Sequence, residues 1–139
     1  MKGYRKVLIA VKDSRDLLRQ GLRVAEDEKC WVTVVKVIPP HDGSLNLTAV
    51  KNIEDLLDNG ARKATAEINE IAETEKVLVK TRIEEGEVHE KILEVAEDED
   101  CDLIIMGQNK TNWIKRLFGR NIVEKIINQA PCPVLVVGT

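Results

Sequence analysis

Short apolar runs alternate along the whole chain with longer stretches in which apolar residues recur every three or four positions. The runs are rich in β-branched residues and end at turn-forming residues, which predicts strands, whereas the spaced stretches predict amphipathic helices. Ser14 precedes the first spaced stretch and is a suitable helix N-cap. Asn121 is expected to cap the last helix, with Glu124 completing a capping box. The expected strands are residues 6–11, 30–38, 77–83, 102–107 and 134–137.

The expected helices lie between these strands. They cover the stretch from Ser14 to Ala25, residues 48–74 with a weak point at Asn59-Gly60, residues 88–96, and residues 121 onward to the break at Pro131. A strand that is apolar almost throughout and is followed by a helix belongs to a parallel sheet covered on both faces. The pattern therefore predicts an α/β fold, a doubly wound five-stranded parallel sheet sandwiched by four helices, in one domain spanning residues 1–139.

Ligands of such sheets bind outside the carboxyl ends of the strands, where the winding direction reverses. This rule nominates the loops after the first, second and fourth strands, namely Lys12-Asp13, residues 38–43 and residues 107–120. Any small-molecule site is expected there.

Composition narrows the class of protein. The 139 residues carry a net charge of −3, which argues against a dedicated nucleic-acid binder. The longest apolar runs are far below the roughly 20 residues that span a bilayer, and the first residues lack the apolar core of a signal peptide. Three widely spaced cysteines (Cys30, Cys101 and Cys132) suggest neither a disulfide framework nor a zinc site. We expect a cytoplasmic protein without nucleic-acid or membrane partners.

The loop between residues 108 and 123 is a local basic island in an acidic chain, and it contains Lys110, Lys115, Arg116 and Arg120 without an acidic residue. It leads into a helix N-terminus, which favours an anion such as phosphate. The other interpretation is a solvated basic face without a ligand.

The same loop carries apolar bulk: Trp113, Ile114, Leu117 and Phe118. These side chains either fold back to plug the cleft or meet a partner surface. Plugging is the simpler of the two interpretations.

No catalytic constellation is apparent. His41 and His89 are the only histidines, neither lies in a nucleophile or metal-binding motif, and both are expected at the surface. The acidic stretches at residues 84–87 and 94–102 are typical of solvated helix charge rather than of a paired acid and base. The sequence predicts neither catalytic residues nor a metal site, and hence a protein that is not an enzyme.

Three segments together resemble the universal stress protein family over almost the whole chain. They are KVLIAV at residues 6–11, EGEVHEKILEVAEDEDCDLIIMG at 85–107 and EKIINQAPCPVLVV at 124–137. The resemblance implies a Rossmann-like fold of the adenine-nucleotide alpha-hydrolase type and a role in the stress response. It also implies a homodimer that pairs through the last strand, with Val134, Leu135, Val136 and Val137 at the interface.

Many members of this family bind ATP through G-x2-G-x9-G-[ST] after strand four and an Asp after strand one. Here Gly107 matches the first glycine, but Lys110, Arg120 and Asn121 stand at the other three positions, and Lys12 stands where the Asp is usual. The chain therefore resembles the branch of the family without an intact glycine motif. We expect it to act through protein interaction, with the loop from Trp113 to Phe118 as a candidate surface, or through an unknown ligand, without ATP bound in the usual mode.

The alternative is a sensor of ATP, another nucleotide or a phosphate-bearing ligand, because lysine and arginine themselves bind phosphate. In that case the cations and the last helix's N-terminus would hold phosphate, while Val37 and Ile38 would line a base pocket. The candidate cleft residues are Lys12, Asp13, Val37, Gly107, Lys110, Arg120 and Asn121.

Overall fold

A computed structural model describes residues 6–28, 30–39, 53–109 and 116–138. Strands and helices alternate strictly through these residues, and all strand pairs are parallel. The five strands form one sheet in the order β3-β2-β1-β4-β5. The elements are β1 (Lys6–Val11), α1 (Arg15–Glu28), β2 (Trp31–Ile38), α2 (Ile53–Thr74), β3 (Val79–Glu85), α3 (Val88–Asp98), β4 (Leu103–Gln108), α4 (Arg120–Gln129) and β5 (Val134–Gly138).

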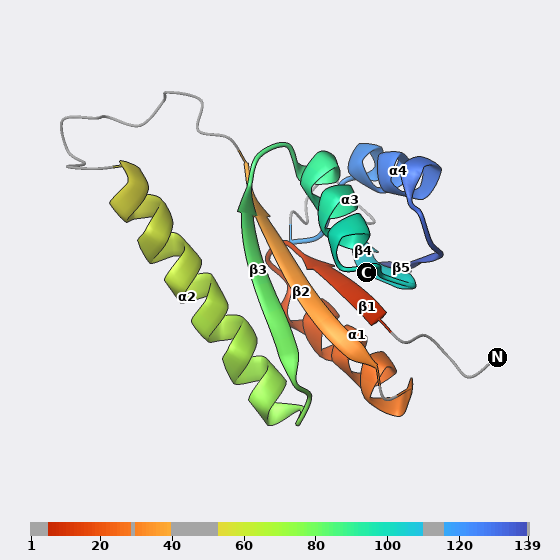
Figure 1. Cartoon of the computed structure of the whole chain (residues 1–139), viewed down its shortest axis with the longest axis horizontal. Coiled ribbons are helices and arrows are strands. Elements are labelled where there is room, and N and C mark those ends of the chain that lie inside the picture. Colours follow the sequence, from red (N-terminus) through yellow and green to blue (C-terminus); the bar gives the residue numbers. More distant parts are fainter. Residues whose placement is uncertain (1–5, 29, 40–52, 110–115, 139) are drawn as a thin grey trace.

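Helices cover both faces of this sheet (Figure 1), and one apolar core lies on each face. Alternate residues of β1 point to opposite sides, because side chains alternate along a strand. Ile9 packs with residues of α1 and α2, whereas Leu8 packs with residues of α3 and α4. The predicted fold class, a doubly wound five-stranded parallel sheet between four helices, is confirmed.

The winding direction reverses between β1 and β4. The chain moves outward from β1 through β2 to β3, then crosses to the other side of β1 for β4 and β5. The carboxyl ends of β1 and β4 therefore border the crevice where doubly wound sheets hold ligands.

The third strand begins two residues later than predicted. Residues 75–77 complete α2 instead: Lys76 has a φ of 59°, and the Val77 N–H donates to the carbonyl of Ala72 at 3.0 Å. This is the hydrogen bond of a Schellman helix end. The strand then continues through Glu84 and Glu85, which pair with β2 beyond the predicted end at residue 83.

The last helix also begins differently. Its N-cap is Gly119, which makes no side-chain capping hydrogen bond, and Asn121 already lies inside the helix. The expected capping box of Asn121 and Glu124 is therefore wrong. The buried side of α4 consists of Val123 and Ile126, while Ile127 is 52% exposed.

The other boundaries agree closely with the prediction. Helix α2 runs unbroken through Asn59-Gly60, and its expected first residues, 48–52, lie outside the described residues. Ser14 caps α1 as predicted, since its Oγ accepts the Leu17 N–H at 3.1 Å. Among the described helices, none combines the length and apolar character needed to cross a membrane.

Candidate functional site

The loops that follow β1 and β4 meet at the crevice predicted to hold a ligand. The backbone N–H of Asp13, just after β1, donates to the carbonyl of Arg116 at 2.9 Å. Arg116 belongs to the segment between β4 and α4. The backbone at Arg116 therefore lies against the residues that follow β1.

Asn109 holds this segment in place. Its side-chain amide donates to the carbonyl of Leu117 at 2.7 Å, and its Oδ1 accepts the Leu117 N–H at 3.0 Å. Backbone bonds add to this clamp: the Phe118 N–H donates to Gly107, and the Asn109 N–H donates to Phe118. Four hydrogen bonds thus return the chain to the strand it has just left.

The clamp places Leu117 directly over Gly107. A Cβ atom on Gly107 would lie 2.6 Å from the Leu117 Cδ2, so a larger residue than glycine would collide with this side chain. Leu117 is 1% exposed and packs in the core shared with α1 and α2, whereas Phe118 enters the core on the other face. Leu117 and Phe118 thus fold back into the structure, as the simpler interpretation predicted, and Leu117 covers Gly107. Trp113 and Ile114 lie outside the described residues.

A small cavity of about 100 Å³ lies at the carboxyl end of β1. Charged residues from α1, α2, β2 and the loop after β1 line it together with apolar side chains. Lys36 lies 3.6 Å from the Asp13 carboxylate, and Arg15 lies 3.5 Å from Glu67. The charged residues around it are Lys12, Asp13, Arg15, Lys36 and Glu67.

The structure brings together only part of the predicted cleft. Lys12 and Asp13 line the cavity, but Val37 packs against the core on the opposite face of the sheet. Arg120 is exposed and its Nε contacts Glu124 at 2.8 Å, an ion pair along α4. Asn121 is exposed, and Lys110 lies outside the described residues.

Lys36 and Asn109 are site residues that sequence analysis did not identify. Lys36 lies one position beyond the buried part of β2, where a lysine gives no special signal. Asn109 acts through contacts eight residues away, which depend on how the loop folds.

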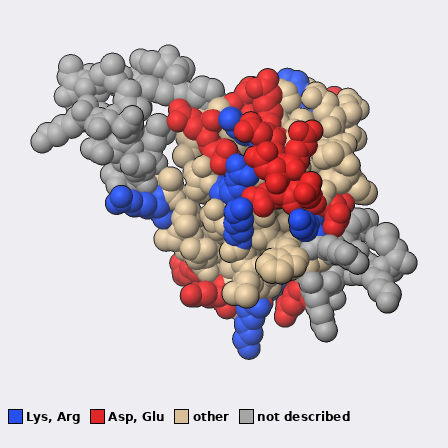
Figure 2. Space-filling view, viewed as in Figure 1, with Lys and Arg blue, Asp and Glu red and all other residues tan. Residues whose placement is uncertain are grey.

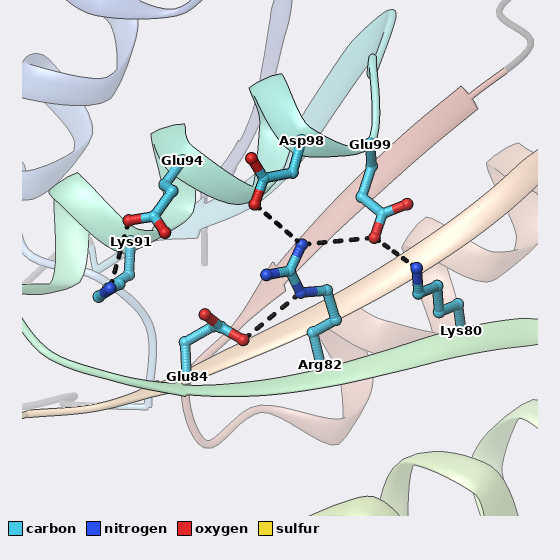
Figure 3. A network of polar contacts seen from close by, with 7 residues as sticks. All are labelled: Lys80, Arg82, Glu84, Lys91, Glu94, Asp98 and Glu99. Carbon is cyan, nitrogen blue, oxygen red and sulfur yellow. Dashed lines mark hydrogen bonds and ion pairs between the residues drawn. The ribbon is translucent and has the colours of Figure 1, made fainter.

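The acidic stretches form an ion-pair network around Arg82, on β3, rather than a catalytic pair (Figure 3). Burial tends to lower the pKa of Arg82, but Glu84 and Asp98 outweigh that effect and raise it. Glu99 accepts a hydrogen bond at its Oε1 from the Lys80 Nζ at 2.7 Å, and this bond is the main cause that lowers the pKa of Glu99. These contacts join β3 to the end of α3, where three carboxylates, those of Glu84, Asp98 and Glu99, face two cations, Lys80 and Arg82.

One group of metal-ligand atoms occurs in the described residues: those of Glu87, His89 and Glu90 lie within 4.8 Å of one another. All three belong to one turn at the start of α3, where Glu87 is the N-cap. The His89 Nδ1 lies against the Glu87 carboxylate, and the side chain is only 15% exposed, so His89 is less exposed than expected. Charge at a helix start explains this group without a metal.

Cys101 and Cys132 do not present reactive thiols. Burial is the main cause that raises the pKa of Cys101 to about 12, and it also raises the pKa of Cys132. Both thiols are therefore protonated near neutral pH, and the thiolate is the reactive form.

The family is decided by comparison with known proteins. The model of the universal stress protein family matches residues 3–138. The chain belongs to the universal stress protein family. Universal stress protein MJ0531 of Methanocaldococcus jannaschii is 30% identical, over 96% of this chain and 82% of its own length.

Solved structures of universal stress proteins share the fold. The structure of protein MJ0577 superposes with a TM-score of 0.75 and 26% identity, covering 98% of this chain and 96% of that one. Universal stress protein UspA from Lactobacillus plantarum superposes with a TM-score of 0.74 and 24% identity, covering 96% of this chain and 97% of that one. The chain is thus a stress-response protein by family and has the family's sheet order.

Proposed function

We propose that this universal stress protein acts in the cytoplasm as a binding protein, without turnover and without ATP in the family's glycine loop. The observation that carries the proposal is the packing of Leu117 against Gly107. In the ATP-binding motif, glycines let backbone N–H groups approach the phosphates closely. Here a buried leucine lies against that first glycine.

The cavity that Lys12 and Asp13 line also argues against a nucleotide. Small-molecule pockets usually measure about 300–1,000 Å³, whereas this cavity among the described residues measures about 100 Å³. Lys110 and Arg120 replace two glycines of the motif, and Arg120 is already paired with Glu124. Opening the site would require Leu117 to leave the core.

The proposal includes a homodimer that pairs through β5. This strand lies at the edge of the sheet and hydrogen-bonds only to β4, so its outer backbone groups are available to a second strand. Its side chains are exposed or half-buried, and Leu135 is 40% exposed. Val134, Leu135, Val136 and Val137 would lie at this interface.

A protein partner is the proposed binding target of the loop from Trp113 to Phe118. Leu117 and Phe118 are buried, so within the described part of the loop only Arg116 is exposed. Within the described part of this loop, contacts to a partner would therefore come from Arg116.

Calorimetric titration with ATP and Mg²⁺ tests the central part of the proposal. We expect no saturable heat with the wild-type protein at millimolar ATP. A Leu117→Ala variant, checked for folding by circular dichroism, serves as the control in which the plug is shortened. Micromolar binding to the wild type that Lys110→Ala abolishes would contradict the proposal.

A second candidate function is supported by the charges of the cavity. Lys12, Arg15 and Lys36 border it beside the start of α1, an arrangement that favours a phosphate group. Distant structural relatives were solved in complex with cAMP and with dAMP, at 15% and 18% identity. In this case a phosphate-bearing ligand would bind at the cavity, with its remaining part outside.

Native mass spectrometry of freshly purified protein separates the two candidates. A co-purifying phosphate-bearing ligand that is lost in Lys12→Ala and weakens as salt rises would favour the sensor. Protein that carries no such mass would favour the binding protein without a nucleotide.

A further inference from the structure

An apolar ridge lies at the end of the sheet opposite the candidate site. Trp31 is 80% exposed and Leu78 is 95% exposed, among the highest exposures of the described large apolar residues. Val32 pairs with Val79, so the residues just before them, Trp31 and Leu78, lie side by side at the amino ends of β2 and β3. We call this pair the Trp31–Leu78 ridge.

Hollows flank the ridge on both faces of the sheet. One, of about 390 Å³, is bordered by Thr33, Lys80 and Glu99, on the side covered by α3. The other, of about 500 Å³, is bordered by Ala25, Glu26 and Lys76, where α1 and α2 end. Trp31 and Leu78 line both hollows, so the surface consists of an apolar ridge between two depressions.

Exposed apolar side chains that gather in this way mark an interaction surface. Tryptophan is also among the residues that contribute most to protein interfaces. In Figure 2 carboxylates gather over α3, while the part of the same face where β2 and β3 begin is mainly uncharged and bordered by charges of both signs. The ridge therefore borders the acidic surface and is not part of it.

We propose that the occupant of this surface is a second copy of the chain, related by a two-fold axis. An interface of this kind needs a self-complementary surface, because the same residues face each other from both copies. A ridge beside hollows meets this need: the ridge of one copy fits a hollow of the other. The rim carries both signs as well, since Glu26 and Lys76 border the same hollow, while Lys80 and Glu99 are already paired with each other at 2.7 Å.

This interface is separate from the pairing proposed for β5. Strands β2 and β5 are separated by β1 and β4, and the ridge lies at the amino ends of the strands. The two interfaces can therefore form together or alone, and each can be tested while the other stays intact.

Sedimentation-velocity ultracentrifugation tests the proposal with three variants. They are Trp31→Ser/Leu78→Ser, Leu135→Asp as the control for β5, and the combination of all three changes. We expect the ridge variant to have half the mass of the wild type, or less, at equal concentration. If β5 also pairs, Leu135→Asp lowers the mass to that of the ridge dimer and the combined variant is a monomer; if it does not, Leu135→Asp leaves the mass unchanged.

A ridge variant with the same mass as the wild type would overturn the proposal, whatever Leu135→Asp does. Circular dichroism confirms that each variant is folded, and both ridge residues are exposed, so little destabilisation is expected.

Charge exchange then tests whether the occupant is a second copy of the chain. Lys76→Glu should weaken association at least tenfold, and adding Glu26→Lys should restore it, because the double variant is again self-complementary. A double variant as weak as the single one would count against a second copy.

Discussion

Two glycines in helix interiors have opposite surroundings. A Cβ atom on Gly21, in α1, would lie 2.9 Å from the Ile9 Cδ1 and 3.2 Å from its Cγ1, whereas nothing lies within 4 Å of a Cβ on Gly60, in α2. Ile9 is fully buried and cannot move aside freely.

We therefore predict opposite effects of the same substitution. Gly21→Ala should lower the free energy of unfolding by about 1–2 kcal/mol, because overpacking outweighs the better helix propensity of alanine. Gly60→Ala should raise it by about 0.5–1 kcal/mol. Urea unfolding followed by circular dichroism measures both, and a Gly21→Ala protein as stable as the wild type would refute the packing argument.

The residues of the candidate site were predictable only in part. Lys12 and Asp13 follow a buried strand, so their place at the carboxyl end of the sheet follows from the strand alone. The roles of Asn109 and Leu117 depend on a loop that returns to its own strand. A contact of this kind leaves no periodic pattern in the sequence, because the apolar residues of the loop do not recur at a regular spacing.

At the level of the secondary-structure elements, two polar residues near helix starts can be compared directly, one at α1 and one at α4. The Ser14 side chain accepts a backbone N–H at the start of α1, whereas Asn121 is exposed and lies inside α4. Ser14→Ala should lower the free energy of unfolding by about 1 kcal/mol. Asn121→Ala should change it by less than about 0.5 kcal/mol, as for most surface substitutions.

Thermal and urea unfolding of these two variants provide the measurement. Equal losses of stability in both would show that Asn121 caps α4 after all.

The boundaries of the elements show where local pattern stops being informative. Residues 77–83 alternate as a strand would, yet Lys76 adopts the left-handed conformation and Val77 bonds back into α2. A glycine or asparagine at position 76 would have indicated that helix end, but a lysine gives no such indication. Asn121 was misleading because a contact distant in sequence fixes the start of the last helix. The bridge between Gln108 and Phe118 keeps the chain extended up to Gly119, and α4 begins directly after that residue.

The architecture of the whole molecule was readable from the sequence because each strand is followed by a helix. Apolar strands, covered on both faces by crossover helices, require a parallel sheet, and the sheet has that form. The Trp31–Leu78 ridge was not predictable in the same way. Trp31 opens an apolar run, and such a run predicts a buried strand whether or not its first residue is covered.

The central claim is that Leu117 closes the exit of β4 where the family's glycine loop would hold a triphosphate. A crystal structure of the protein grown with millimolar ATP and Mg²⁺ tests it most directly. The account predicts Leu117 against Gly107, Asn109 bonded to Leu117, and no nucleotide over the end of β4. Adenosine phosphate bound there, with main-chain N–H groups on its oxygens and Leu117 displaced, would contradict the account.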